Sequence, residues 1–220
     1  MASEYFKRWC VCMAGLLLCG TGSYCTVQAS AIGIGAWETF QTGLSLSTGI
    51  LYGNCTVMVS FAIILIDLLL KGKIGIGTLC NAVIIGKTVD FWHLTFDFLP
   101  LAQTLPVGLL YLVCGQLLNA FGSYLYMKPA LGCGPRDTLL VGMARRIRRV
   151  PIGIVSVALL SLATLLGGLL GGPVGIGTLI SAFCSGPIMQ AAFVSVHFDA
   201  THIHHQKLGD SFRVIFSGKV

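Results

Sequence analysis

Long apolar runs alternate with short polar stretches along most of the chain. A helix needs roughly 20 mostly apolar residues to cross a hydrocarbon core about 30 Å thick. Six runs meet this length and predict six transmembrane helices, at about 9–28, 51–70, 76–97, 105–127, 152–171 and 174–196. The pattern therefore predicts an all-α, polytopic membrane protein.

Two further segments, 36–49 and 135–149, are too short or too polar to cross a membrane alone. They predict short helices that are either interfacial or re-entrant. Gly134 and Pro135 mark the start of the second one, because glycine serves as a helix cap and proline is favoured at the first helical position.

The apolar pattern is also duplicated. The motif GIGTL occurs twice, one hundred residues apart, and Gly53 and Gly86 return at the same spacing as Gly153 and Gly186. Each half supplies three predicted spans, so the second half enters the membrane from the opposite side and the repeats are expected to be inverted. The residues that define the motif are Gly75, Gly77, Thr78, Gly175, Gly177 and Thr178.

The distribution of Lys and Arg predicts which side of the membrane each loop and terminus occupies. Only 10% of the 220 residues are charged and 55% are hydrophobic, whereas soluble domains carry about 25% charge. With the N-terminus inside, thirteen of the fourteen Lys and Arg residues fall on the cytoplasmic side, and Lys87 lies within a span. Cytoplasmic loops collect such residues, so both termini are predicted to be cytoplasmic.

The domain organisation follows from the repeat. Residues 1–197 form one integral membrane domain, with repeat one at about 9–97 and repeat two at about 105–196. Residues 198–220 form a cytoplasmic tail that is rich in histidine. We interpret the tail as a solvated end rather than as a metal site, because such tracts have low specificity for metals.

Polar residues inside the predicted spans are functional candidates, because ionisable groups in hydrocarbon are costly and usually face a bundle interior. Lys87 lies mid-span, and Asp90, three residues on, is placed to neutralise it. The polar residues within the spans predict either a polar path through the bundle or a Lys–Asp pair that fixes helix packing. For Asp67 we expect a simple pair with Lys71. The candidate centre comprises Lys87, Asp90, Asn81, Gln116 and Asn119.

The glycine motifs and the short-helix acids each allow two interpretations. The GIGTL glycines permit either close helix packing or a locally unwound helix at a substrate site. Glu38 and Asp137 fall in the first turns of the two short helices. There they form a cation or proton site, or they simply complement the helix dipole.

Other features narrow the chemistry. The basic residues Arg145, Arg146, Arg148 and Arg149 predict contact with anionic headgroups and serve mainly as an orientation signal. The nine cysteines have no zinc-type spacing and are expected to be apolar packing residues. No Walker motif, nucleophile elbow or HExxH is present, so we predict no enzyme, metal, cofactor or nucleic-acid partner.

The doubled GIGTL, the block GCGPRDTLL at 132–140 and the block GGPVGIGTLISAF at 171–183 resemble the YczE/YyaS/YitT family of bacterial membrane proteins. The resemblance covers about 10–196 and is closest to the YczE-like branch, in the second half. The first half departs at GIGAWETF, which lacks the proline and arginine. The resemblance implies a bacterial inner-membrane protein with a repeat architecture, but no substrate.

Two functions are compatible with these patterns. The first is a transporter or permease-like protein for an unknown small solute, based on the inverted repeats and the Lys87/Asp90 centre. The second is a non-transporting membrane protein that binds or regulates a partner through the basic run and the tail. A homo-oligomer is compatible with both.

Overall fold

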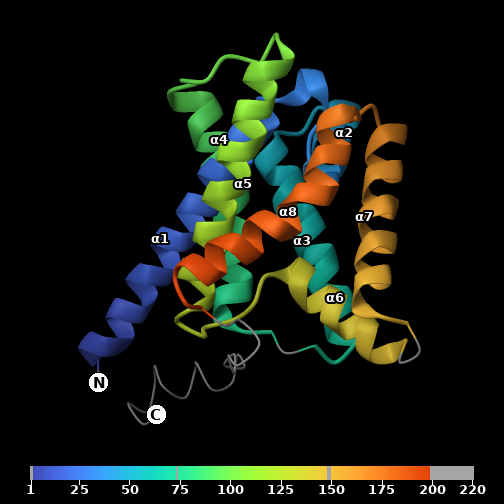
Figure 1. Ribbon diagram of the computed structural model, residues 1–220. Helices are drawn as coiled ribbons and strands as arrows, with labels where there is room; N and C mark the ends of the chain where they lie inside the picture. The colour runs from blue at the N-terminus through green and yellow to red at the C-terminus, as the bar shows by residue number, and fades with distance from the viewer. Residues whose placement is uncertain (1, 73, 148–149, 199–220) are drawn as a thin grey trace.

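The computed structural model describes residues 2–72, 74–147 and 150–198, and these residues are all-helical apart from their connections. The elements are α1 (Ala2–Val27), the 3-10 turn η1 (Ser30–Ile32), α2 (Ala36–Thr48), α3 (Tyr52–Leu69), α4 (Ile76–Thr95), α5 (Leu105–Met127), α6 (Pro135–Arg146), α7 (Ile152–Leu169) and α8 (Ile176–Ser195) (Figure 1).

The helices lie where the apolar pattern predicts them. The six long helices match the six apolar runs, and α2 and α6 match the two shorter segments. Five of the long helices, α1, α3, α5, α7 and α8, are apolar enough to cross a membrane. Helix α4 has the length, at 20 residues, but Asn81, Lys87 and Asp90 make it more polar. The chain is a polytopic helical membrane protein.

Helices α1 and α5 pack together through glycine positions that correspond between the repeats. A Cβ on Gly22 would meet the backbone of Gly115, and a Cβ on Gly122 would meet that of Gly15. Contacts therefore run in opposite directions along the two helices, which are antiparallel. Small residues allow this close approach of backbones.

The two GIGTL motifs begin α4 and α8. In each, the N–H of the capping glycine donates to the threonine of the next turn, from Gly75 to Thr78 Oγ1 and from Gly175 to Thr178 Oγ1, both at 3.2 Å. These helix starts contact the loop of the other repeat.

The loop contacts are reciprocal. Gly33, in the loop before α2, lies against Gly175, and Gly132, in the loop before α6, lies against Thr78. The N–H of Gly77 donates to the carbonyl of Leu131 at 3.0 Å. Gly33 and Gly132 have φ of 94° and 153°, which glycine adopts more readily than other residues.

The halves differ in how their second and third long helices meet. In the first half, Gly53 of α3 and Gly86 of α4 lie in direct backbone contact. In the second half, no described residue outside the local helix lies within 4 Å of a Cβ built on Gly153 of α7 or on Gly186 of α8. Helix α7 instead packs mainly on α2, at one edge of the molecule (Figure 1).

Candidate functional site

The first turns of the two short helices meet each other. Arg136 of α6 places Nη1 3.8 Å from Oε1 of Glu38 in α2. Its guanidinium also lies 5.1 Å from the ring centroid of Trp37, a cation–π contact. Trp37 and Arg136 occupy equivalent places in the two repeats, ninety-nine residues apart. Both charged side chains are partly exposed, at 16% for Glu38 and 29% for Arg136.

The start of α3 extends this polar region. The hydroxyl of Tyr52 donates to Oε1 of Gln41 at 2.9 Å, and both side chains are buried. Gln41 follows Glu38 by three residues on α2 and so lies on the same side of that helix. Three helices from both halves, α2, α3 and α6, therefore contribute to one polar cluster.

Asp90 lies on α4 beside the start of α3. Its Oδ1 accepts the N–H of Gly53 at 2.7 Å, while Oδ2 is buried and has no hydrogen-bond partner among the described residues. The residue is only 7% exposed. A buried carboxylate oxygen without a partner is costly, so Asp90 is a functional candidate.

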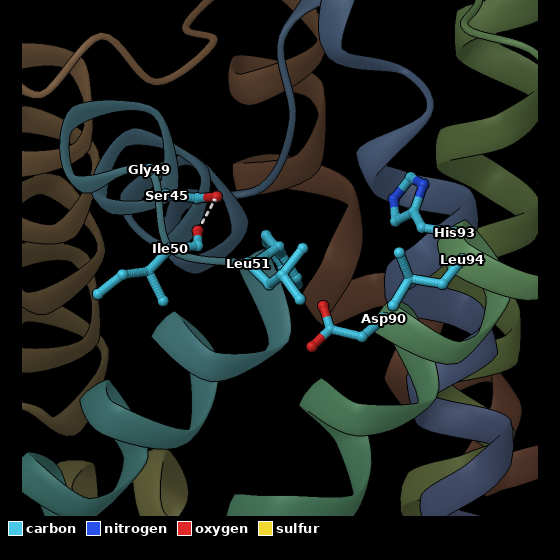
Figure 2. A pocket seen from close by; sticks show the side chains of 8 residues that line it. Ser45, Gly49, Ile50, Leu51, Asp90, His93 and Leu94 are labelled. Atoms are coloured by element: carbon cyan, nitrogen blue, oxygen red, sulfur yellow. Dashed lines mark hydrogen bonds between the residues drawn. The ribbon is translucent and has the colours of Figure 1, made fainter.

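A cavity of ≈ 260 Å³ opens beside Asp90 (Figure 2). Its walls come from the end of α2, the start of α3 and the last turns of α4. In Figure 2 the Asp90 carboxylate points toward the start of α3, with His93 one turn further along α4. The lining residues are Ser45, Gly49, Ile50, Leu51, Tyr52, Asp90, His93 and Leu94.

Asp137 forms a second cluster, on the other side of Arg136. Its Oδ2 accepts the Tyr126 hydroxyl at 3.1 Å and lies 3.8 Å from the Cys133 sulfur. Burial raises the pKa of the Asp137 carboxyl, whereas the Tyr126 hydrogen bond and the Arg136 charge lower it. Burial also raises the pKa of the Cys133 thiol, and the charges of Asp137 and Asp67 add to this rise.

The predicted pairing of Lys87 with Asp90 is wrong. Lys87 is exposed on α4, and its Nζ donates to Oδ1 of Asn54 on α3 at 2.6 Å, while Asp90 binds Gly53. Lys87 and Asp90 are three positions apart in the sequence. The Asp90 carboxylate lies close to the backbone of α3, however, and accepts its hydrogen bond from an N–H of that helix.

The other predicted members of the centre lie in separate contacts. Gln116 of α5 donates through Nε2 to Ser181 Oγ of α8 at 3.0 Å. Asn119 packs against Gly22 of α1, and buried Asn81 lies near Gly134. Of these five residues, Asp90 lines the cavity. No hydrogen bond joins any two of these five described residues.

The predicted pair of Asp67 with Lys71 is also wrong. Asp67 is fully buried, and both of its carboxylate oxygens have no hydrogen-bond partner among the described residues. Lys71 is exposed and adopts a positive φ of 56°. The turn at the end of α3 therefore directs the two side chains apart.

The basic run and the tail are covered only in part. Arg145 and Arg146 are exposed at the end of α6, and Arg146 donates to the Leu69 carbonyl at 3.3 Å. Arg148, Arg149 and residues 199–220 lie outside the described residues. Within the described part, no group of three His, Cys, Asp or Glu side chains is arranged to hold a metal ion.

Sequence reasoning missed most of the cluster. The charge distribution counts Arg136 among the cytoplasmic Lys and Arg residues, yet Arg136 contacts Glu38 of the other repeat. A usable signal was present, since Trp37–Glu38 and Arg136–Asp137 are the same positions of the two repeats. Residues at equivalent positions beside a two-fold axis meet each other.

Comparison with known proteins agrees with the membrane character of the fold. Residues 6–193 match the family of unknown function DUF6198. An uncharacterized protein of Haemophilus influenzae is 32% identical over 202 residues, which cover 92% of this chain and 90% of the relative.

Two Bacillus subtilis proteins are also similar. The uncharacterized membrane protein YczE is 28% identical over 86% of this chain and 87% of its own length, and the uncharacterized protein YyaS is 26% identical over 83% and 90%. No solved structure matches the chain. The wider link to YitT stays a prediction. The chain thus belongs to the DUF6198 family, as a YczE-like helical membrane protein.

Proposed function

We propose that this protein is a transporter of a small solute, built as two inverted repeats of three transmembrane helices, each with one re-entrant short helix. The antiparallel contact of α1 with α5 supports the inversion. These helices are equivalent in the two repeats, and a two-fold axis that relates antiparallel helices runs across them, hence in the membrane plane. The glycine contacts at Gly22 and Gly122 obey this symmetry.

Helix α4 is the sixth span of the proposal. It has 20 residues, about 30 Å at 1.5 Å per residue, and it packs between α1 and α3. Its C-terminal end lies among aromatic side chains, including Trp92, Phe96 and Phe98. Aromatic residues gather at membrane interfaces, so this cluster supports a helix end at the membrane surface.

The proposed orientation places both termini in the cytoplasm of a bacterial cell, in the inner membrane. In this orientation the external loops are residues 29–50, 98–104 and 171–173, and they contain no Lys or Arg. Most of the Lys and Arg residues lie in the connections at the cytoplasmic face. Arg136 leaves this count, because we place both short helices as re-entrant toward the middle of the bundle, where Arg136 contacts Glu38. Irregular backbone at that depth is tolerated where protein surrounds it.

The difference between the halves supports the proposal of transport. The contact of Gly53 with Gly86 closes α3 against α4, while α7 and α8 are apart at the equivalent Gly153 and Gly186. Alternating access in inverted repeats exchanges two such arrangements around a fixed site. We infer that the structure is one of two states related by this exchange.

The observation that carries the function is Asp90, which lines a cavity of ≈ 260 Å³ and whose buried Oδ2 has no hydrogen-bond partner among the described residues. A carboxylate beside aliphatic and aromatic walls favours a small organic cation, since the charge pairs with the carboxylate and the carbon groups contact the walls. Tyr52 and His93 are the ring-bearing residues of the lining. Quaternary ammonium ions suit such rings.

Labelled choline is a suitable probe, because its permanent charge prevents passive crossing of a lipid bilayer. The purified full chain in proteoliposomes should take up choline with saturation, and Asp90→Asn should reduce uptake at least tenfold while insertion and thermal stability stay close to wild type. Lys87→Gln, which changes an exposed cation away from the cavity, is the matched control and should retain most of the uptake.

Two results would overturn the proposal. Folded wild-type protein that shows no saturable uptake of choline, tetramethylammonium or a primary amine is not the proposed cation transporter. Equal uptake by wild type and Asp90→Asn removes Asp90 from the site. Dependence on the C-terminal tail without any flux favours the partner-binding alternative.

A further inference from the structure

Asp67 is a buried acid with no partner. It lies in the last turn of α3, is 0% exposed, and neither carboxylate oxygen has a hydrogen-bond partner among the described residues. An isolated carboxylate loses its hydration in such a place without compensation. The C-terminal end of a helix carries the negative end of the dipole, which disfavours a carboxylate further. Both effects favour a carboxyl that holds a proton.

Among the described residues, the groups around Asp67 do not supply a counter-charge. From the segment before α6, the Cys133 thiol lies close enough to feel the Asp67 charge, but it is not a cation. Arg146, at the end of α6, donates to the Leu69 carbonyl instead. Glu38 of α2 and Asp90 of α4 lie toward the other end of α3, beside Tyr52.

The other repeat shows what this position does when no acid is present. The equivalent residue, one hundred positions on, is Gly167 of α7. A Cβ there would collide with the backbone of Thr39 and Phe40 in α2, so α7 and α2 meet at backbone distance. At the matching contact of α3 with α6, the Asp67 side chain occupies the interface, beside Gly72 and Thr138.

We propose that Asp67 is a proton-binding site and that the contact between α3 and α6 closes only when its carboxyl is protonated. On closure, an Oδ atom takes one proton from water at the open face and forms one O–H bond. On opening, the carboxyl is rehydrated, its O–H bond breaks, and the proton passes to water and leaves the carboxylate. The link to transport rests on the proposed function, whereas the proton site itself does not.

Infrared difference spectroscopy tests the site directly. The full chain in lipid at neutral pH should show a C=O band of a protonated carboxyl that is missing in Asp67→Asn. The band should persist in Asp97→Asn, where the acid is 64% exposed at the end of α4. Asp67→Glu, which keeps a titratable group, should restore a band. An Asp67→Asn spectrum identical to wild type shows that Asp67 is ionised and overturns the inference.

Choline uptake then tests the coupling. Wild-type uptake should change severalfold when a pH difference is imposed across the vesicle membrane, whereas Asp67→Asn should keep uptake and lose this response. A full response in Asp67→Asn overturns the coupling. Absence of choline uptake in wild type contradicts the proposed function, while the infrared result still decides whether Asp67 binds a proton.

Discussion

The two halves of this membrane protein share a sequence pattern but not a packing arrangement. In the first half, α3 and α4 meet at Gly53 and Gly86, and Asp90 of α4 binds the backbone at the start of α3. In the second half, a Cβ built on Gly153 or Gly186 meets no other described segment within 4 Å. Under the proposed exchange of arrangements, these two glycines would serve close contact of α7 with α8 in the other state.

The largest effect is expected from filling the glycine contact. A side chain at Gly86 meets the Gly53 carbonyl and Thr56, so Gly86→Leu should destabilise the fold by about 1–3 kcal/mol, as overpacking does. Gly186→Leu meets no neighbour in this structure and should change stability by roughly 0.5 kcal/mol or less. Unfolding in detergent micelles measures both.

The variants Gly86→Leu and Gly186→Leu also distinguish an effect on stability from an effect on transport. Gly186→Leu should leave the protein folded yet reduce choline uptake severalfold, because the side chain blocks the state in which α7 closes on α8. Normal uptake by Gly186→Leu contradicts the exchange of arrangements. Equal destabilisation by both variants contradicts the difference between the halves.

A smaller effect is expected at the helix starts. Thr78 and Thr178 both accept a hydrogen bond from the capping glycine, but Thr78 Oγ1 also donates to the Cys133 carbonyl at 2.7 Å. Thr78→Val should therefore cost about 1 kcal/mol more stability than Thr178→Val, the value of one further hydrogen bond. Thermal unfolding of the two variants provides the comparison, and equal losses contradict the assigned role of the second bond.

The sequence predicts the order of helices well, because apolar runs and glycine spacing are local signals. It does not predict which polar groups meet. Lys87 and Asp90 are three positions apart, but Lys87 hydrogen-bonds Asn54 and Asp90 hydrogen-bonds Gly53. Both partners belong to α3, so these bonds depend on how α3 packs against α4. Asp67 and Lys71 diverge because the chain turns at Lys71.

The meeting of Arg136 with Glu38 depends on tertiary structure in the same way. The two residues are ninety-eight positions apart, and each belongs to a segment that was expected at its own face of the membrane. Symmetry between the repeats brings them together. Repeat spacing therefore predicts such contacts better than periodicity within a single helix.

The central claim is that the two halves exchange closed and open arrangements. Distances between pairs of spin labels, measured by electron paramagnetic resonance, test this claim. One pair is placed at exposed Met58 of α3 and Val83 of α4, and the equivalent pair at exposed Ala158 of α7 and Phe183 of α8. The exposed Cys10 and Cys114 are replaced first. On addition of choline or a change of pH, one distance should lengthen as the other shortens. Two fixed distances, or two that change in the same direction, would contradict the account.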